Sequence, residues 1–155
     1  MKNEVEVGDK APDFELPTST GEKIRLVDYF GKKTVVLYFY PKDFSPGCTK
    51  EACAFRDSYE LFKEAVAEVI GVSSDTEESH NMFTIKLGLP FQLLSDEEGK
   101  VRKLYGVPSS LGMVPGRVTY VIDKEGIVRY IFNSQINAER HMEESLKILR
   151  SLKST

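Results

Sequence analysis

Apolar residues recur along this chain at two spacings, which divide it into alternating short strands and helices. Residues 34–40 form a continuous apolar, β-branched and aromatic run, which is typical of a central strand buried on both faces. Shorter apolar or alternating runs predict strands at 13–16, 23–26, 66–73, 91–94, 118–122 and 127–132. Apolar residues three and four positions apart predict helices at 46–63, 75–87, 101–105 and 137–152. This order indicates an α/β domain in which helices flank a central mixed sheet.

Turn residues between these elements complete the outline. Thr20-Gly21 joins the first two strands into a short N-terminal hairpin, and residues 123–126 join the last two strands. Asp75 is the expected N-cap of the second helix, and residues 107–116 are expected to form an ordered loop near the functional site. We find no linker or internal repeat, so residues 1–155 are expected to form a single domain.

The loop after residues 34–40 leads into a helix start that holds the first cysteine. Ser45 is a favourable N-cap, because its side-chain oxygen can accept a hydrogen bond from a free amide of the first turn. Pro46 then falls at the first helical position, where its missing N–H is no loss, and Cys48 falls at the third. A helix N-terminus carries roughly half a positive charge, which favours a thiolate over a thiol. We therefore predict that Cys48 is a reactive nucleophile; the alternative is a buried structural cysteine.

The second cysteine, Cys53, follows five residues later on the same predicted helix. Two such positions are roughly 140° apart around the helix, and their Cα atoms are roughly 8–9 Å apart. A disulfide requires a Cα separation of about 4.4–6.8 Å, so the pair can bond only if the helix start unwinds. The spacing favours a switchable redox pair over a permanent disulfide, and two unrelated thiols remain the alternative.

Composition and charge argue against several other classes of protein. The formal net charge of −3 gives no excess that would steer the chain to nucleic acid or to an anionic membrane. Two cysteines in 155 residues do not make a disulfide scaffold. Residues 1–6 lack the apolar core of a secretory signal, and no run reaches the ~18 apolar residues of a membrane helix. These features predict a soluble, cytoplasmic protein.

The residues around the first cysteine match a known family. Pro41-x-x-x-Ser45-x-x-Cys48 resembles the active-site signature of peroxiredoxins, and its flanking residues 40–43 and 46–53 resemble the Bcp/PrxQ subgroup. The resemblance continues through residues 8–14, 79–80, 89–91 and 116–123, and so covers nearly the whole chain. It implies a thioredoxin-like fold and a thioredoxin-dependent thiol peroxidase that reduces hydrogen peroxide and organic hydroperoxides.

The resemblance also implies a role for each residue of the site. Cys48 is expected to attack the peroxide and become a sulfenic acid, which Cys53 resolves as an intramolecular disulfide. Pro41 is expected to shield the thiolate, and the Ser45 hydroxyl to bond the sulfur or the peroxide. Arg117 is expected to be the catalytic cation; without the resemblance it is one arginine among several.

The implied partners are a hydroperoxide and thioredoxin or a similar dithiol reductant, with no cofactor, and the expected state is a monomer or weak dimer. Two residues depart from the family pattern. Ser45 stands where Thr is common, and Phe44 stands where the subgroup often has an acid. Serine keeps the hydroxyl and loses only the restraint of a methyl group on its rotamer, so we expect a modest effect on rate.

Three other functions compete with this interpretation. A metal module would combine both cysteines with His80 and His141, but the two histidines lack the paired spacing of zinc sites, so no metal site is expected. His80 is expected at a helix surface or interface, and His141 in solvent. A thiol–disulfide oxidoreductase of the thioredoxin class would need Cys-x-x-Cys, which this chain does not contain. No residue pattern specifically supports a redox sensor, a chaperone or an interaction domain.

Overall fold

The computed structural model describes residues 4–110 and 114–153, which are organised around a five-stranded sheet. Its strands lie in the order β5-β4-β3-β8-β9, with the bounds β3 Thr34–Phe39, β4 Ala67–Ser73, β5 Gln92–Ser95, β8 Val118–Ile122 and β9 Val128–Asn133. Strands β3, β4 and β5 are parallel, whereas β8 pairs antiparallel with β3, and β9 pairs antiparallel with β8. The predictions of a mixed sheet and of a central, fully buried strand at its middle are confirmed.

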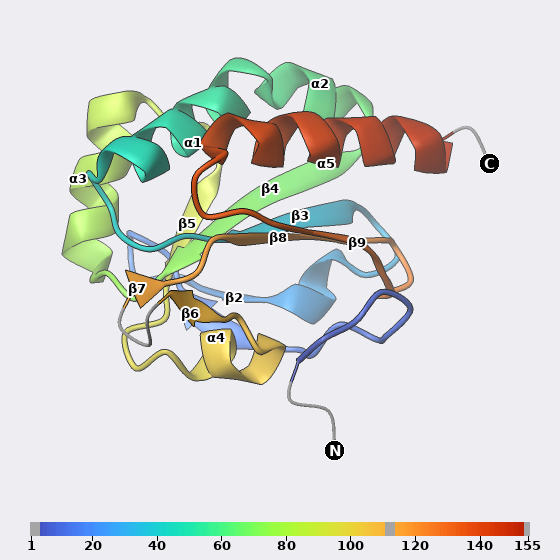
Figure 1. Ribbon diagram of the computed structural model, residues 1–155, viewed down its shortest axis with the longest axis horizontal. Coiled ribbons are helices and arrows are strands. Elements are labelled where there is room, and N and C mark those ends of the chain that lie inside the picture. The colour runs from blue at the N-terminus through green and yellow to red at the C-terminus, as the bar shows by residue number, and fades with distance from the viewer. Residues whose placement is uncertain (1–3, 111–113, 154–155) are drawn as a thin grey trace.

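Helices and a small hairpin cover the two faces of this sheet (Figure 1). One face carries α1 (Pro46–Asp57), α2 (Tyr59–Glu64) and α5 (Ala138–Lys153), while α3 (Glu77–Leu87) packs beside β5. The other face carries the hairpin of β1 (Glu15–Pro17) and β2 (Lys23–Arg25), the 3-10 helix η1 (Leu26–Tyr29) and α4 (Lys100–Tyr105). Among the residues described, no helix combines the length and apolar character that crossing a bilayer requires.

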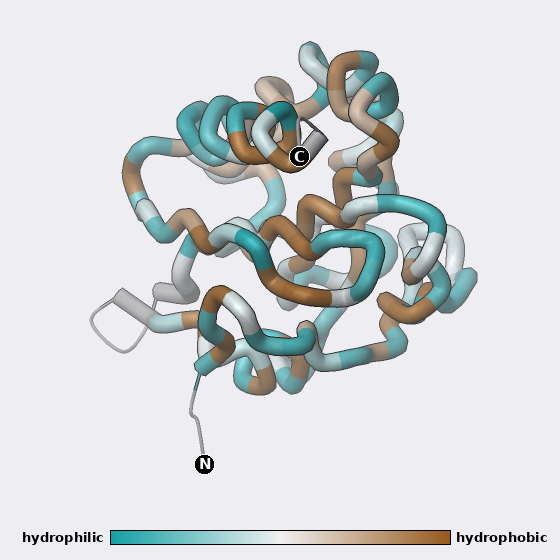
Figure 2. Tube along the Cα trace, turned by 90° about the vertical axis from the view of Figure 1, so that its right-hand side faces the viewer, coloured by the Kyte–Doolittle hydropathy of each residue, from teal (hydrophilic) through white to brown (hydrophobic). Residues whose placement is uncertain are grey.

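The side chains of β3 alternate between two apolar cores, one on each face of the sheet. Val35, Leu37 and Phe39 pack with the N-terminal hairpin and α4, whereas Val36 and Tyr38 pack with α1, α2 and α5. In Figure 2 the most hydrophobic stretches accordingly run through the middle of the molecule. The loop that leaves the C-terminal end of β3 therefore starts from a rigid, buried platform.

The predicted helix at 46–63 is two helices, because Ser58 leaves the helical conformation at φ −107° and ψ 7°. Its apolar face nevertheless continues across the break, since Phe55 and Phe62 are both fully buried and in contact. The predicted N-cap Asp75 is wrong. Thr76 caps α3 by accepting a 3.1 Å hydrogen bond from the Ser79 amide.

The predicted loop at 107–116 contains a short antiparallel pair, β6 (Ser109–Ser110) and β7 (Val114–Pro115). Residues 111–113 of that loop lie outside the described residues. The loop ends at Gly116, two residues before the start of β8, which brings it to the C-terminal end of β3.

Candidate active site

The loop between β3 and α1 begins with Tyr40 and Pro41, at the C-terminal end of the central strand. Phe44 turns this loop with a positive φ of 67°, and Ser45 is the N-cap of α1, as predicted. The predicted capping bond is absent, however. The Ser45 hydroxyl instead donates to the Lys42 carbonyl oxygen at 2.9 Å. This bond tightens the loop immediately before the helix.

Cys48 is the third residue of α1, and its side chain faces the core. Only 1% of the residue is exposed, and its neighbours in this core include Tyr38 and Tyr40 of the sheet and loop. The position predicted for the thiol is therefore confirmed. The first turn of a helix has free backbone amides and a partial positive charge, and burial shields the Cys48 sulfur there from bulk water.

Arg117 reaches Cys48 from a segment 69 positions away in the chain because of the register of two strands. Phe39 at the end of β3 pairs with Val118 at the start of β8, so Arg117 lies beside the loop that leads to α1. A Cβ atom on Gly47 would lie 2.9 Å from Arg117 Nη2, which places the guanidinium against the first turn of α1. Cys48 and Arg117 are thus brought together.

The guanidinium of Arg117 is buried and has several partners. Nη1 donates to Glu51 at 2.6 Å, and Nε donates to the Gln135 carbonyl oxygen at 3.1 Å. Burial lowers the pKa of Arg117, but the charges of Glu51 and Cys48 and the hydrogen bond to Glu51 raise it, and the net shift is upward. The arginine is therefore held as a cation between a carboxyl group and the thiol.

Glu51 is a member of the site that sequence reasoning missed. It lies one helical turn after Cys48 and is completely buried. Burial raises its pKa to about 8, although Arg117 opposes this shift. One signal could have found it: an acid interrupts the apolar face of α1 between Cys48 and Phe55, at a position where a solvated glutamate would not be expected.

His141 continues this buried polar group. Its Nε2 atom is 2.8 Å from the Ser134 carbonyl oxygen, which can only accept, so Nε2 carries a hydrogen. Its Nδ1 atom is 2.8 Å from the Thr119 hydroxyl and 3.6 Å from Glu51 Oε2. Burial lowers the pKa of His141 to about 4. The hydrogen bond to the Ser134 carbonyl opposes this shift, and the charge of Arg117 adds to it. The expectation of a solvated His141 is wrong, because it continues the inward face of α5.

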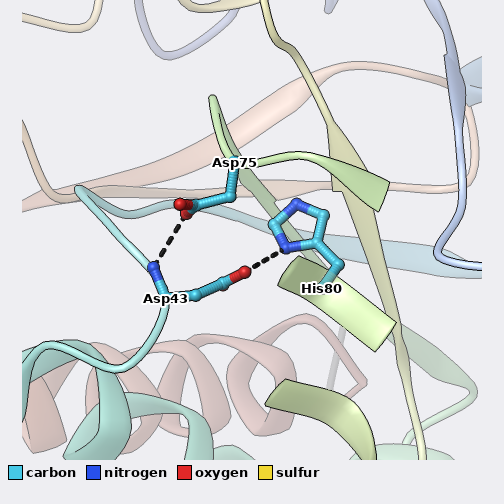
Figure 3. A group of neighbouring side chains, drawn as sticks. All are labelled: Asp43, Asp75 and His80. Atoms are coloured by element: carbon cyan, nitrogen blue, oxygen red, sulfur yellow. Dashed lines mark hydrogen bonds and ion pairs between the residues drawn. The ribbon is translucent and has the colours of Figure 1, made fainter. Parts of the chain in front are cut away.

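His80 is also fully buried, so its predicted place at a surface or interface is wrong. Its Nδ1 atom is 2.7 Å from Asp43 Oδ2 (Figure 3), and its Nε2 atom is 3.0 Å from the Leu94 carbonyl oxygen. The other Asp43 oxygen accepts a 2.6 Å hydrogen bond from the Tyr40 hydroxyl. This network anchors the loop before α1 to helix α3.

Asp43, Asp75 and His80 offer donor atoms within 4.8 Å of one another, which is close enough to surround a cation. These atoms already bond within the protein. The Asp75 carboxylate accepts from the Asp43 amide at 2.8 Å and from the Ser73 hydroxyl at 2.6 Å, and Asp43 pairs with His80 (Figure 3). The cluster therefore has a complete structural role without an ion. The cysteine–histidine set of a metal module is not assembled, since His80 and His141 belong to separate networks.

Cys53 and Pro41 complete the predicted set. Cys53 is a free, half-buried thiol away from the core-facing side of α1, as its position in the sequence predicts. Cys48 is also free, and α1 runs without interruption through both cysteines. Pro41 is half-buried and follows Tyr40 directly. The described fold thus represents the state in which the two thiols are separate.

Arg102 is a second buried arginine near this loop, and no sequence pattern indicated it. Its Nη2 atom donates to the Tyr40 carbonyl oxygen at 2.9 Å, and its Nη1 atom donates to the Gly116 carbonyl oxygen at 3.1 Å. It lies on the short helix α4, where a basic residue would ordinarily face solvent.

Comparisons with known proteins identify the family of this chain. The family model described as AhpC/TSA family matches residues 7–131. Peroxiredoxin Q, chloroplastic, from Sedum lineare is 56% identical over 94% of this chain and 78% of its own length. Peroxiredoxin Q, chloroplastic, from Arabidopsis thaliana is 56% identical over 95% of this chain and 68% of its own length.

Solved structures of similar proteins share the fold. Peroxidoxin BcpB from Mycobacterium tuberculosis superposes with a TM-score of 0.88 at 38% identity, covering 94% of this chain and 97% of that chain. A mutant PrxQ from Xylella fastidiosa superposes with a TM-score of 0.90 at 29% identity, covering 98% and 99% of the two chains. The predicted thioredoxin-like fold is therefore confirmed.

The names of the relatives correct one expectation. The sequence predicts a cytoplasmic protein, whereas the relatives from Sedum lineare, rice and Arabidopsis thaliana are chloroplastic, so that prediction is wrong. The physical reason is that the prediction relied on the missing apolar core of a secretory signal. Transit segments for plastids are amphipathic and rich in Arg and Ser, so they contain no such core either.

The family match and the extent of the similarity show the family, and the fold brings Cys48 and Arg117 together. The chain belongs to the AhpC/TSA family and is, within it, a peroxiredoxin of the Bcp/PrxQ subgroup, an enzyme of the thiol peroxidase class.

Proposed function

We propose that this enzyme reduces hydrogen peroxide and small organic hydroperoxides by nucleophilic attack of the Cys48 thiolate. The observation that carries the proposal is the position of Cys48 in the first turn of α1, with the buried Arg117 guanidinium beside its sulfur. The helix N-terminus and the guanidinium both favour negative charge on the sulfur. A thiolate is the form of cysteine that attacks an oxygen.

In the proposed first step, the Cys48 sulfur bonds to one oxygen of the peroxide and the O–O bond breaks. The departing oxygen leaves with the electron pair and takes a proton from water, so the products are Cys48 sulfenic acid and an alcohol or water. Arg117 stabilises the charge that develops on the departing oxygen. Sulfur is oxidised by two electrons, and the peroxide is reduced by two.

The Ser45 hydroxyl has a more specific role in this proposal than the family resemblance alone implies. Its hydrogen points to the Lys42 carbonyl oxygen, so the hydroxyl oxygen is left to accept a hydrogen bond. Ser45 can therefore orient the O–H of an incoming peroxide. Pro41, which has no N–H, bounds the same loop without offering a competing donor.

In the proposed second step, the Cys53 thiol condenses with the sulfenic acid to a disulfide, and water leaves. Both cysteines lie on the continuous helix α1, where the separation is roughly 8–9 Å between Cα atoms, so the helix start must unwind first. Because one chain supplies both thiols, a monomer suffices for the cycle. A thioredoxin-type dithiol then reduces the disulfide and is itself oxidised.

Peroxide consumption by the purified protein with thioredoxin, thioredoxin reductase and NADPH tests the proposal. Wild type is expected to turn over, and Cys48→Ser is expected to lose at least 99% of the activity. Cys53→Ser is the matched control, because it should still consume one equivalent of peroxide but fail to cycle with thioredoxin. Full activity of Cys48→Ser would refute Cys48 as the attacking residue.

Mass spectrometry after one equivalent of peroxide separates the two steps. Wild type is expected to lose two hydrogens, which indicates an internal disulfide. Cys53→Ser is expected to gain one oxygen at Cys48 and, with excess peroxide, a second. Normal cycling of Cys53→Ser with thioredoxin would refute Cys53 as the resolving thiol while leaving the first step intact.

A further inference from the structure

Arg102 links two segments of the site that the strands themselves no longer hold together. The β3–β8 ladder runs from Val35–Ile122 to Phe39–Val118. Beyond this end, Arg102 donates from one nitrogen to the carbonyl oxygen of Tyr40, one position after Phe39, at 2.9 Å, and from another to that of Gly116, two positions before Val118, at 3.1 Å. The guanidinium thus continues the connection between the two segments of the chain where strand pairing stops.

The two carbonyls belong to the peptide groups that lead into two residues of the site. Tyr40 is bonded to Pro41, and Gly116 is bonded to Arg117. A peptide group is planar, so fixing its carbonyl oxygen also fixes the nitrogen and Cα of the next residue. A guanidinium presents its N–H groups in a rigid planar fork, which sets the distance between two acceptors bound at once.

The side chain of Arg102 is itself firmly held. It is 93% buried, its guanidinium carbon lies 5.9 Å from the centre of the Phe39 ring, and its own amide donates to Asp96 at 2.9 Å. Asp96 also accepts from the Val101 amide at 3.2 Å, so one carboxylate fixes the start of α4. Among the described residues the Nε atom of Arg102 has no hydrogen-bond partner.

Arg102 is a buried cation, and its Nε–H group has no hydrogen-bond partner among the described residues. Its burial is therefore unfavourable unless its other contacts compensate, and a structural link between two loops could be made at lower cost by a neutral side chain. Burial lowers the pKa of Arg102, while Asp96 and Cys48 oppose this, so the arginine also contributes positive potential at the thiol.

We propose that Arg102 is a positioning residue of the peroxidase site, which holds Pro41 and Arg117 in place around the Cys48 sulfur through the two carbonyls that precede them. The inference rests on the proposed attack by Cys48. Arg102 does not touch the peroxide; it sets the geometry in which Arg117 meets the departing oxygen. The second positive charge is a smaller, additional contribution.

The test uses three variants on one short helix. Arg102→Met removes the fork and the charge, Arg102→Lys keeps the charge but loses the planar fork, and Lys103→Met is the control because Lys103 is exposed next to Arg102. All are made in the Cys53→Ser background, so that a single thiol is followed. Far-UV circular dichroism and urea unfolding establish that each variant is folded.

Two rates are compared for each variant: reaction with hydrogen peroxide, from competition with a haem peroxidase, and alkylation by iodoacetamide. Alkylation needs an accessible thiolate but no oriented Arg117. We expect Arg102→Lys and Arg102→Met to react with peroxide at least tenfold more slowly than the parent, while their alkylation rates change less than threefold. Lys103→Met should match the parent in both rates. Arg102→Lys keeps the test informative if Arg102→Met does not fold.

A peroxide rate within twofold of the parent in Arg102→Lys would overturn the geometric role, because the charge alone would then suffice. A parallel fall of both rates would also overturn it, since Arg102 would then act on the ionisation of the thiol or on the fold. The parent protein, Cys53→Ser, distinguishes failure of the proposed function from failure of this inference. If the proposed function is wrong, the parent will react with peroxide no faster than a variant that carries both Cys53→Ser and Cys48→Ser.

Discussion

The Arg117 guanidinium donates a 2.6 Å hydrogen bond to the Glu51 carboxylate, in a place where Arg117 is 4% exposed and Glu51 is fully buried. Glu51 lies one helical turn after Cys48, which interacts with the same guanidinium. One buried cation therefore serves two groups that compete for its charge. The protonation of Glu51 decides how much of that charge faces the thiol.

Replacing Glu51 by glutamine should change how stability depends on pH. Burial raises the pKa of Glu51 to about 8 in the folded protein, above its ordinary value of 4.5. The folded chain then binds more protons than the unfolded chain between these values, so the wild type should lose stability as pH rises from about 4.5 to about 8. Urea unfolding at pH 5, 6, 7 and 8 should show Glu51→Gln free of this loss, which is on the order of a few kcal/mol.

Glu64→Gln is the control for this experiment, because Glu64 is an exposed glutamate on the neighbouring helix α2. It should follow the wild-type profile. Parallel profiles for Glu51→Gln and wild type would show that Glu51 binds no extra proton in the folded state.

His141 should give the opposite slope in a more acidic range. Burial lowers its pKa to about 4 from 6.5, so the unfolded chain binds the extra proton between these values, and stability is lost as pH falls from about 6.5 to about 4. His141→Gln should remove this loss. Because Glu51 titrates in an overlapping range, the comparison is made in the Glu51→Gln background, by urea unfolding at pH 4.5, 5.5 and 6.5. An unchanged slope would contradict a neutral buried imidazole.

Gly47→Ala should separate activity from stability. The new Cβ would lie 2.9 Å from Arg117 Nη2, the far end of a side chain that can move, so we expect Arg117 to shift away from Cys48. The peroxide rate constant should fall about tenfold, since a misplaced charge stabilises the departing oxygen less well. Stability should change by less than ~1 kcal/mol, because the helix propensity gained with alanine offsets part of the cost of moving the buried Arg117 away from Glu51.

Competition with a haem peroxidase measures the Gly47→Ala rate, and thermal unfolding measures its stability. Thr49→Ala, two positions further on the same helix, is the control and should keep the wild-type rate. A Gly47→Ala rate within twofold of wild type would mean that the guanidinium already has room for the methyl group.

The sequence predicts most of the fold because its main signals are local. The apolar run at Thr34–Phe39 identifies the central strand, and the Ser45-Pro46 pair locates the start of α1. The break at Ser58 was missed because Phe55 and Phe62 keep the helical spacing across it. In such cases an apolar pattern indicates which face of the helix is buried, but it does not indicate whether the helical backbone is continuous.

The buried polar groups of the site could not be predicted in the same way, because their partners are far along the chain. Arg117 and Glu51 are 66 residues apart, Arg102 and Tyr40 are 62 apart, and His80 and Asp43 are 37 apart. A charged or imidazole side chain is placed in solvent by default when no partner is known. Arg117 was identified by family resemblance, and the strand register that explains its position is a property of the folded sheet.

Val66 offers a stabilising substitution away from the site. Its φ of 55° is strained for a β-branched residue, and its backbone cannot relax, because its N–H donates to the Lys63 carbonyl at 2.9 Å and its carbonyl accepts from the Thr34 amide at 3.1 Å. Asparagine tolerates this conformation, and the valine side chain is 45% exposed, so little apolar burial is lost. We expect Val66→Asn to increase the free energy of unfolding by about 1 kcal/mol and to raise the melting temperature by about 2–4 °C in thermal unfolding.

Val7→Asn is the control, because Val7 is 59% exposed without a positive φ, and it should give no gain in stability. An equal change in both variants would attribute the effect to surface polarity and not to the backbone at Val66.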